Sequence, residues 1–441
     1  MQVLFELIKK IADFIWGQHM LVFILGSGLY FSLRLKGIQF SKFLLAVKAV
    51  FTSGKTTGEG NITPYQALMS ALSGIIGNGN IAGVATAIAV GGPGAVFWMW
   101  MSALPLMATM YSESLLGFLY RRKDEDGTFL GGPMVYIQKA LKWKWLAVSF
   151  AFFMALKTLL ATTSIQSNSM SIVLNNQFNI PHLYSCLLIA FFTWLVIIGG
   201  LKTIARTAEF LSPIMTLLYI SGGLLVILLN ADKLGNVFAD IFTYAFTTKG
   251  VVGGFAGASM MMALRYGAAR GAYSNEAGTG SVAIMHATAQ TNDPKGQSLI
   301  AMTGVFIDTF LCTITALVIL TAGTWTGSLN STALTSVSFS TALPHGNWIV
   351  LVASLLFGYS TLITWCFYGE QSAVFLFGDK IKKSYRWLFC LAILVGATPD
   401  AEKIWSMGDL FNGMTVIINL IGIVALSSVV VRFTFNNKWR K

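Results

Sequence analysis

Long apolar runs separated by short polar segments recur along the whole chain. A helix of about 20 apolar residues spans the roughly 30 Å hydrocarbon core of a bilayer. The pattern therefore predicts an all-α polytopic membrane protein, with one transmembrane domain over residues 1–441 and about eleven transmembrane helices. Their expected bounds are 16–33, 66–90, 95–120, 146–174, 183–200, 208–230, 254–287, 299–323, 347–377, 385–398 and 410–432.

The composition of the chain agrees with this class of protein. Of its 441 residues, 55% are hydrophobic and 11% are charged, whereas a soluble domain carries about 25% charged residues. In a soluble protein the formal net charge of +12 would suggest a nucleic-acid partner, but cytoplasmic loops of membrane proteins also accumulate Lys and Arg. We therefore expect a lipid bilayer around the chain, no nucleic-acid partner and no obligate protein partner.

The basic residues predict an orientation in the membrane. If the N-terminus is outside and the loops alternate, the inside segments hold 22 lysines and arginines, the outside segments hold 5, and three lie within spans. Cytoplasmic loops carry the excess of positive charge. We therefore expect a multi-pass protein of the cell inner (plasma) membrane with its N-terminus outside and its C-terminus in the cytoplasm.

Two of the predicted spans carry polar clusters. The span 66–90 contains Gly77-Asn-Gly-Asn80, and the span 254–287 contains Tyr273-Ser-Asn-Glu276. Glycine weakens a helix interior by about 1 kcal/mol relative to alanine, so both helices are expected to break there. Close helix packing through small residues is an alternative for the glycines, but it does not account for amides and a carboxylate in hydrocarbon.

The two interrupted spans lie five spans apart, in corresponding positions of two halves. Such a pair is typical of the binding site of an inverted-repeat transporter, where half-helix N-termini face a substrate carboxylate and unwound carbonyls face a cation. An amino acid carried together with a cation suits this site. We therefore expect one extra helix, 16–33, followed by five-helix repeats over 66–230 and 254–432.

An enzyme and a channel are less consistent with the sequence. The four histidines are scattered without metal-ligand spacing or a nucleophile motif, so the protein is not expected to be an enzyme. Channels usually build a pore from symmetric rings of charged groups or carbonyls, whereas this chain has one asymmetric pair of interrupted helices.

Several long strings resemble the alanine or glycine:cation symporter family, the sodium:alanine symporters. The similarity runs from about Trp16 to Arg432 and rests on residues 77–88 and 91–95, Asp126-Gly127 with 131–134, 269–281 and 304–309. The resemblance implies a LeuT-like fold and sodium-coupled symport of a small neutral amino acid, alanine or glycine, into the cell by alternating access, with Na⁺ as the coupling ion.

One position departs from the family pattern, which has Gly-Thr-Gly-Asn where this chain has Gly77-Asn78-Gly79-Asn80. The amide of Asn78 is larger than the family's threonine at a position expected to contact the substrate. Serine or glutamine therefore stays open as an alternative substrate, and protons stay open as an alternative coupling ion.

The resemblance assigns substrate-binding roles to the two interrupted helices. The backbone at Asn78 and Gly79 would bind the substrate carboxylate. Tyr273 would form an aromatic lid, while Ser274 and Asn275 would supply polar ligands. An interfacial anchor is the alternative role for Tyr273, since tyrosines are enriched at membrane surfaces.

Three further residues complete the expected substrate site. The resemblance places Gln166 beside the substrate, although interhelical hydrogen bonding, worth about 0.6 kcal/mol on average, is an alternative role. Thr361 and Trp365 are four residues apart and share one helix face. Trp365 would close the side of the pocket, and Thr361 would contact both substrate and ion.

The resemblance also implies a sodium site between the first and eighth core helices. The hydroxyls of Ser360 and Thr361 and the carbonyls of Ser73 and Ile76 would form its oxygen shell. Single hydroxyls often bond back to the preceding helical turn, so the expectation depends on the pair.

Asp308 is a carboxylate within an otherwise apolar span. An intramembrane carboxylate is by default a candidate functional residue. Three roles are open: it binds a second cation together with Asn80, it pairs with Arg265 or Arg270, or it carries a proton.

Overall fold

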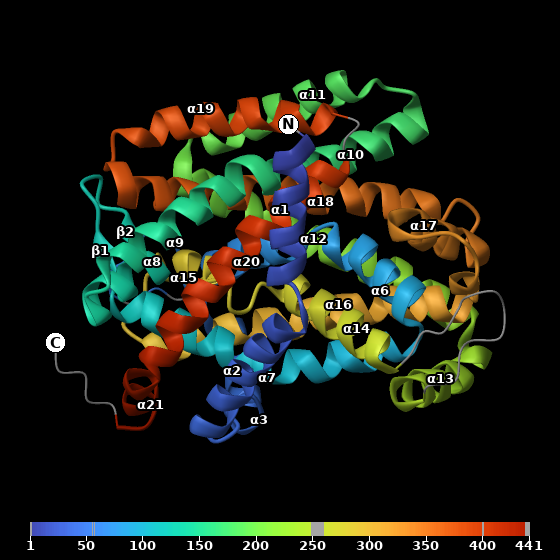
Figure 1. The fold of residues 1–441 in the computed structure, drawn as a ribbon, viewed down its shortest axis with the longest axis horizontal. Coiled ribbons are helices and arrows are strands. Elements are labelled where there is room, and N and C mark those ends of the chain that lie inside the picture. Colours follow the sequence, from blue (N-terminus) through green and yellow to red (C-terminus); the bar gives the residue numbers. More distant parts are fainter. Residues whose placement is uncertain (1, 55, 57, 248–259, 399–400, 437–441) are drawn as a thin grey trace.

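The structure is a computed structural model, and it describes residues 2–54, 56, 58–247, 260–398 and 401–436. Its described part is almost entirely helical (Figure 1). The first half contains α1 (Gln2–Ile15), α2 (Gln18–Arg34), α3 (Ile38–Ser41), α4 (Phe43–Thr52), α5 (Pro64–Ile75), α6 (Val84–Gly91), α7 (Gly94–Leu119), α8 (Pro133–Tyr136), α9 (Lys144–Leu156), α10 (Thr163–Phe178), α11 (His182–Ile197) and α12 (Gly200–Leu229). The second half contains α13 (Leu234–Phe246), α14 (Met260–Asn275), α15 (Ser281–His286), α16 (Pro294–Ala322), α17 (Ser331–Ala342), α18 (Asn347–Phe377), α19 (Ile381–Ile393), α20 (Ala401–Ala425) and α21 (Ser427–Asn436).

Five helices of the described chain are long and apolar enough to cross a membrane, or up to six if one bent pair counts as a single span. The bent pair is α5 with the segment Gly79–Gly91, at an angle of 50°. The predicted count of about eleven spans stays a prediction, because several apolar helices, such as the 16-residue α11, are short for a crossing. The five helices are Lys144–Phe178, Gly200–Leu229, Pro294–Ala322, Asn347–Phe377 and Met407–Ala425.

Part of one predicted span lies outside the described residues. Residues 254–259 of the span 254–287, and Lys249 in the loop before it, belong to this part of the chain. The described remainder consists of α14, a non-helical stretch and α15, so the expected interruption is present.

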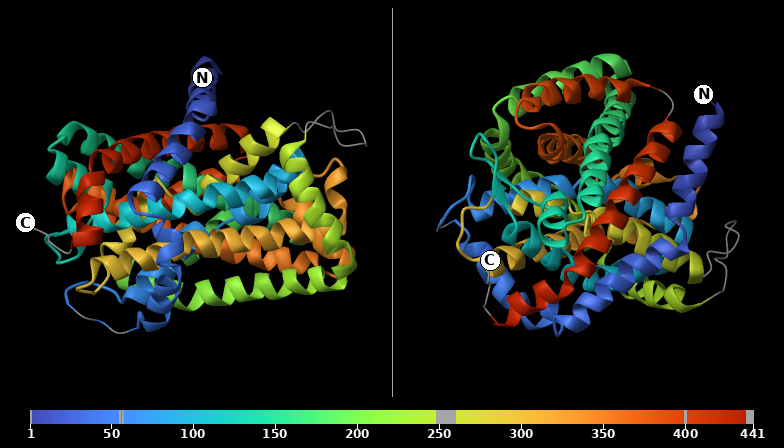
Figure 2. Two further views of the ribbon diagram at one scale, coloured as in Figure 1. Left: turned by 90° about the horizontal axis from the view of Figure 1, so that it is seen from below. Right: turned by 60° about the vertical axis from the view of Figure 1, so that its left-hand side comes forward.

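The two interrupted helices are enclosed by the long ones. α14 packs against α6 and α7, and α5 packs against α12, α16 and α18. In the left view of Figure 2 most of the long helices run side by side, while α1 stands out from the body. α1 was not predicted from the sequence, since its 14 residues are too short to cross a bilayer.

In the described part of the chain three π-helical segments interrupt the regular helices, at Gly79–Gly83, Ile137–Leu141 and Lys157–Thr162. Such segments are rare and occur frequently at functional sites, because the extra residue shifts the side chains that follow it. The first belongs to the α5–α6 break, and the third joins α9 to α10. Both contribute residues to the site described below.

An ionic cluster joins two loops at one end of the bundle. Strands β1 (Arg122–Lys123) and β2 (Phe129–Leu130) pair antiparallel, and the loop between them carries Asp124 and Asp126. The Lys382 ammonium lies 2.7 Å from Asp124 and 2.8 Å from Asp126. This hydrogen bond and positive charge lower the pKa of Asp126 below its usual range. The cluster therefore holds the β1–β2 loop against the start of α19.

Candidate functional site

The first interrupted helix begins and ends for local reasons. Thr63 and Gln66 form a capping box at the start of α5, with Pro64 in its first turn. The helix ends at Ile75, because the next residue, Ile76, has an extended ψ of 100°. The Gly77 N–H, which has lost its helical acceptor, donates instead to Asn80 Oδ1 at 3.0 Å. A side chain thus replaces the missing backbone acceptor, as polar backbone at membrane depth requires.

In the second interrupted helix, side chains also bond the released backbone groups, over a longer stretch. After α14 the backbone takes positive φ angles at Glu276, Gly278 and Gly280, with φ values of 56°, 89° and 79°. The Gly278 N–H donates to Glu113 Oε2 at 3.2 Å, and its carbonyl accepts from Asn419 Nδ2 at 2.9 Å. Buried side chains from α7 and α20 therefore satisfy backbone groups that the break releases.

A small cavity of about 60 Å³ lies between the two breaks. It brings together seven of the eight residues predicted to bind substrate. Asn275 does not line it; its Oδ1 accepts from the Ala277 N–H at 3.1 Å, and its buried Nδ2 has no partner among the described residues. The seven lining residues are Asn78, Gly79, Gln166, Tyr273, Ser274, Thr361 and Trp365.

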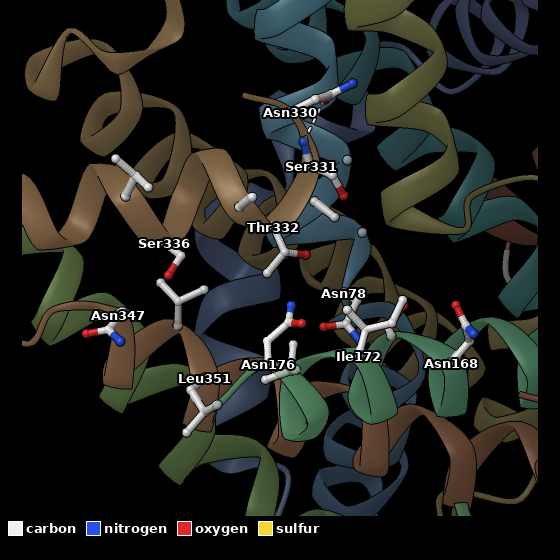
Figure 3. Close-up of a pocket in the computed structure, with 18 of the residues that line it drawn as sticks. Asn78, Asn168, Ile172, Asn176, Asn330, Ser331, Thr332, Ser336, Asn347 and Leu351 are labelled. Atoms are coloured by element: carbon white, nitrogen blue, oxygen red, sulfur yellow. Dashed lines mark hydrogen bonds between the residues drawn. The ribbon is translucent and has the colours of Figure 1, made fainter. Parts of the chain in front are cut away.

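A larger cavity of about 530 Å³ adjoins the small one. It shares Asn78, Gly79, Tyr273 and Ser274 with the small cavity and extends along α10, α17 and the start of α18. Figure 3 shows Asn78 from the first break together with side chains of α10 and α17 around this space. The shared residues therefore lie between a wide outer cavity and a narrow inner chamber.

Asn78, the residue that differs from the family pattern, connects the first helix break to two other helices. Its Nδ2 donates to Gln166 Oε1 at 3.1 Å, and its Oδ1 accepts from Ser354 Oγ at 2.6 Å. The two bonds reach α10 and α18. Beyond its own stretch of chain, Gly79 has no atom within 4 Å of the position where a Cβ would lie, and it lines both cavities. The Asn78 side chain is therefore occupied by two hydrogen bonds, whereas the backbone of Gly79 is accessible from the cavities.

The predicted sodium ligands also meet in the structure. Thr361 Oγ1 lies 3.2 Å from the Ser73 carbonyl and 3.3 Å from the Ile76 carbonyl, and Ser360 Oγ lies 3.4 Å from the Ser73 carbonyl. Both hydroxyls also lie close to the Phe357 carbonyl of their own helix, at 3.0 and 2.8 Å. A proton donated to Phe357 leaves hydroxyl lone pairs facing the other two carbonyls.

The spacing of these oxygens fits a cation the size of sodium. Oxygen ligands lie roughly 2.3–2.6 Å from Ca²⁺, whose radius is close to that of Na⁺, so neighbouring ligands at right angles lie roughly 3.3–3.7 Å apart. The contacts of 3.2–3.4 Å are close to this range. The Ser73 hydroxyl beside them is buried and has no partner among the described residues. The donor set is neutral oxygen, which suits a hard monovalent cation.

Asp308 makes hydrogen bonds on the other side of the first break. Its Oδ1 accepts from Asn80 Nδ2 at 2.5 Å and from Ser274 Oγ at 3.0 Å. These described partners do not include Arg265 or Arg270, and Arg270 lines the larger cavity instead. Of the three roles left open by the sequence, pairing with an arginine is therefore not the arrangement found. The carboxylate links α16 to both interrupted helices.

Sequence reasoning missed a buried ion pair at the small cavity. Lys157 and Glu276 both line it, and Lys157 Nζ lies 3.5 Å from Glu276 Oε2 and 2.6 Å from Asn412 Oδ1. The lysine in an apolar span was the available signal, but its partners are distant in the chain.

Among the described residues no group of three His, Cys, Asp or Glu side chains has metal-site geometry.

Two interrupted helices that meet at a small chamber inside an apolar helical bundle are typical of a multi-pass secondary transporter. The chain belongs to the sodium:alanine symporter family, whose model matches residues 1–441.

Individual relatives agree with this family. The chain is 40% identical over 439 residues to the "Sodium/alanine symporter AgcS" of Methanococcus maripaludis, covering 97% of this chain and 96% of that protein. It is 37% identical over 439 residues to the "Probable sodium/glutamine symporter GlnT" of Bacillus subtilis, covering 98% and 90%. The crystal structure of a mutant of the Eremococcus coleocola manganese transporter matches with a TM-score of 0.52 at 13% identity, over 87% of this chain and 92% of that one. This last likeness concerns the fold alone.

Proposed function

We propose that the protein is a secondary active transporter that carries a small neutral amino acid, alanine or glycine, into the cell together with Na⁺. The observation that carries this proposal is the shared position of Thr361. Its hydroxyl belongs to the oxygen set of the candidate cation site, and its side chain lines the small cavity. Ion and substrate that bind on either side of one side chain stabilise the same local conformation, which is the requirement for coupling.

The dimensions of the small cavity support a small substrate. A volume of about 60 Å³ is small beside the roughly 300–1,000 Å³ of ordinary ligand pockets. The open backbone at Gly79 and the N-terminal end of the following helical segment are suited to a substrate carboxylate. The role of Asp308 as a ligand of a second cation, together with Asn80, is part of the same proposal.

The proposal extends to the architecture. We infer a LeuT-like arrangement of two five-helix inverted repeats after one extra helix, in the inner membrane, with alternating access to the central site. The two breaks, at α5–α6 and at α14–α15, support the repeat. The distribution of basic residues, 22 against 5, supports an outside N-terminus and a cytoplasmic C-terminus.

A second candidate differs in substrate. The name of the Bacillus subtilis relative refers to glutamine, and the Asn78 side chain departs from the family's threonine. A longer substrate would extend from the small cavity into the larger one, which shares four of its lining residues. Serine or glutamine, and protons as the coupling ion, are therefore the alternatives to be tested against alanine with sodium.

Uptake of labelled alanine and glycine into proteoliposomes tests the proposal. A tenfold inward sodium gradient supplies about 1.4 kcal/mol per ion, so one-to-one coupling allows about tenfold accumulation. We expect accumulation only with sodium outside. Equal uptake with potassium or choline in its place would exclude sodium coupling, and accumulation driven by an acid exterior without sodium would favour protons. Competition by unlabelled serine and glutamine ranks the substrates.

A further inference from the structure

The wall of the small cavity includes a lysine within an apolar helical segment. Lys157 begins the π-helical segment between α9 and α10, and its side chain is only 5% exposed. A charged side chain at the centre of a membrane helix costs roughly 2.5–3.5 kcal/mol on insertion scales. A methionine of similar length would fill the same space without this cost. Packing alone therefore does not account for a lysine here.

The Lys157 ammonium is held by side chains from three separate segments of the chain. It lies 2.6 Å from Asn412 Oδ1 on α20 and 3.5 Å from Glu276 Oε2 after α14. It also lies 4.1 Å from the centre of the Trp365 ring on α18, within the range of a cation–π contact. Trp365 in turn donates from Nε1 to the Gly74 carbonyl of the first interrupted helix at 3.0 Å.

These contacts turn a flexible side chain into a fixed surface. Lysine normally keeps considerable rotamer freedom, and methionine in its place would adapt to whatever entered the cavity. Three contacts to the ammonium remove that freedom and at the same time neutralise the charge of Glu276. Lys157 thus forms a rigid wall of the small cavity, next to Trp365 and Glu276.

We propose that Lys157 determines substrate size in this transporter: its fixed side chain closes one wall of the small cavity, so that an amino acid side chain longer than that of alanine fits only by extending toward the larger cavity. This inference rests on the proposed function, because it takes the small cavity as the substrate chamber. It adds a specificity-determining residue that the family resemblance did not supply. Its expected consequence is that a shorter or mobile side chain at position 157 admits longer substrates.

The test compares variants in which the partner charge is removed first. Glu276→Gln avoids leaving a buried carboxylate unpaired. In this background Lys157→Met keeps a side chain of similar volume but loses the three contacts of the ammonium. Lys157→Ala removes three methylenes and the ammonium. Lys144→Ala in the wild-type chain is the matched control, since Lys144 is exposed at the start of the same helix.

The measurement is competition by the unbranched series alanine, 2-aminobutyrate and norvaline against labelled alanine. One methylene in a binding pocket changes affinity by about 10-fold or more. We expect the norvaline-to-alanine affinity ratio to rise at least 10-fold from the Glu276→Gln variant to the Lys157→Ala/Glu276→Gln variant, with the Lys157→Met/Glu276→Gln variant between them. The Lys144→Ala ratio is expected to equal that of wild type.

An unchanged ratio in the Lys157→Ala/Glu276→Gln variant would overturn the role of Lys157. If a variant no longer transports, thermal stabilisation of the purified protein by each amino acid gives the same ratio, because a ligand of the folded state raises the unfolding temperature. Failure of the proposed function is read separately, from the sodium dependence of wild-type uptake. The two outcomes are therefore distinguishable.

Discussion

Thr361 joins the two candidate binding sites at the scale of a single residue. Its hydroxyl lies 3.2 Å from the Ser73 carbonyl and 3.3 Å from the Ile76 carbonyl, and the residue also lines the small cavity. It also donates to Phe357 at 2.8 Å, which orients its lone pairs away from its own helix. A threonine is suited to this position because its hydroxyl serves both as donor and as acceptor.

Thr361→Val tests this role because it removes the hydroxyl and keeps the branched shape. We expect the sodium concentration for half-maximal uptake to rise about 10-fold or more, since each 1.4 kcal/mol of lost ligand interaction is a factor of ten. Thr364→Val is the control: Thr364 is buried on the same helix, and its hydroxyl has no partner among the described residues. The same sodium dependence in both variants would contradict the site.

At the scale of the element, α14 lies close to α7 because Gly267 allows it. A Cβ on Gly267 would lie 2.2 Å from the Ala95 carbonyl oxygen, whereas a Cβ on Gly79 would meet nothing within 4 Å. Small residues at helix contacts of this kind let membrane helices approach closely. The two glycines therefore have different reasons to be glycine: one serves helix packing, and the other leaves backbone open to the cavities.

Two alanine substitutions separate these reasons. Gly267→Ala is expected to destabilise the protein by about 1–3 kcal/mol, as overpacking does, and to lower the unfolding temperature in detergent. Gly79→Ala is expected to leave the unfolding temperature near that of wild type and to weaken amino acid uptake, because the added methyl group enters the cavity. A stable Gly267→Ala protein would show that α14 and α7 separate without cost.

At the scale of the whole molecule, the larger cavity and the Lys382 cluster lie at loops that the sequence predicts to be on opposite sides of the membrane. The cavity reaches residues of α17 and the start of α18, in segments that the charge distribution predicts to be outside. The loops of the Lys382 cluster fall in segments predicted to be cytoplasmic. The structure would then be open to the exterior, one of the two states that alternating access requires.

Cysteine labelling in intact cells tests this orientation. The four native cysteines are all buried, so background labelling is expected to be low. Ser336→Cys in the larger cavity should react with a membrane-impermeant maleimide added outside, and added substrate with sodium should slow the reaction. Lys383→Cys, exposed on α19, should react only after the membrane is permeabilised. The reverse pattern would invert the topology.

The grouping of the candidate site residues was largely predictable because its signals are local or belong to the family. Gly77 to Asn80 and Tyr273 to Glu276 interrupt apolar spans with residues that are costly in hydrocarbon, so a break at each point follows from side-chain chemistry alone. Seven of the eight expected substrate residues line one cavity. Asn275 is the exception, since its side chain accepts a hydrogen bond from the backbone at Ala277. The residue type alone does not predict this local bond.

The membrane class, the two interruptions and the family all follow from the chain read in order, because hydrophobic length, local cost and motif strings are properties of neighbouring residues. Which polar groups meet depends instead on the packing of the helices. Lys157 and Glu276 are 119 positions apart, and Asn80 and Asp308 are 228 apart. In hydrocarbon each buried charge or amide needs a partner, but the identity of that partner is fixed only when the helices come together, and no periodicity along the chain records it.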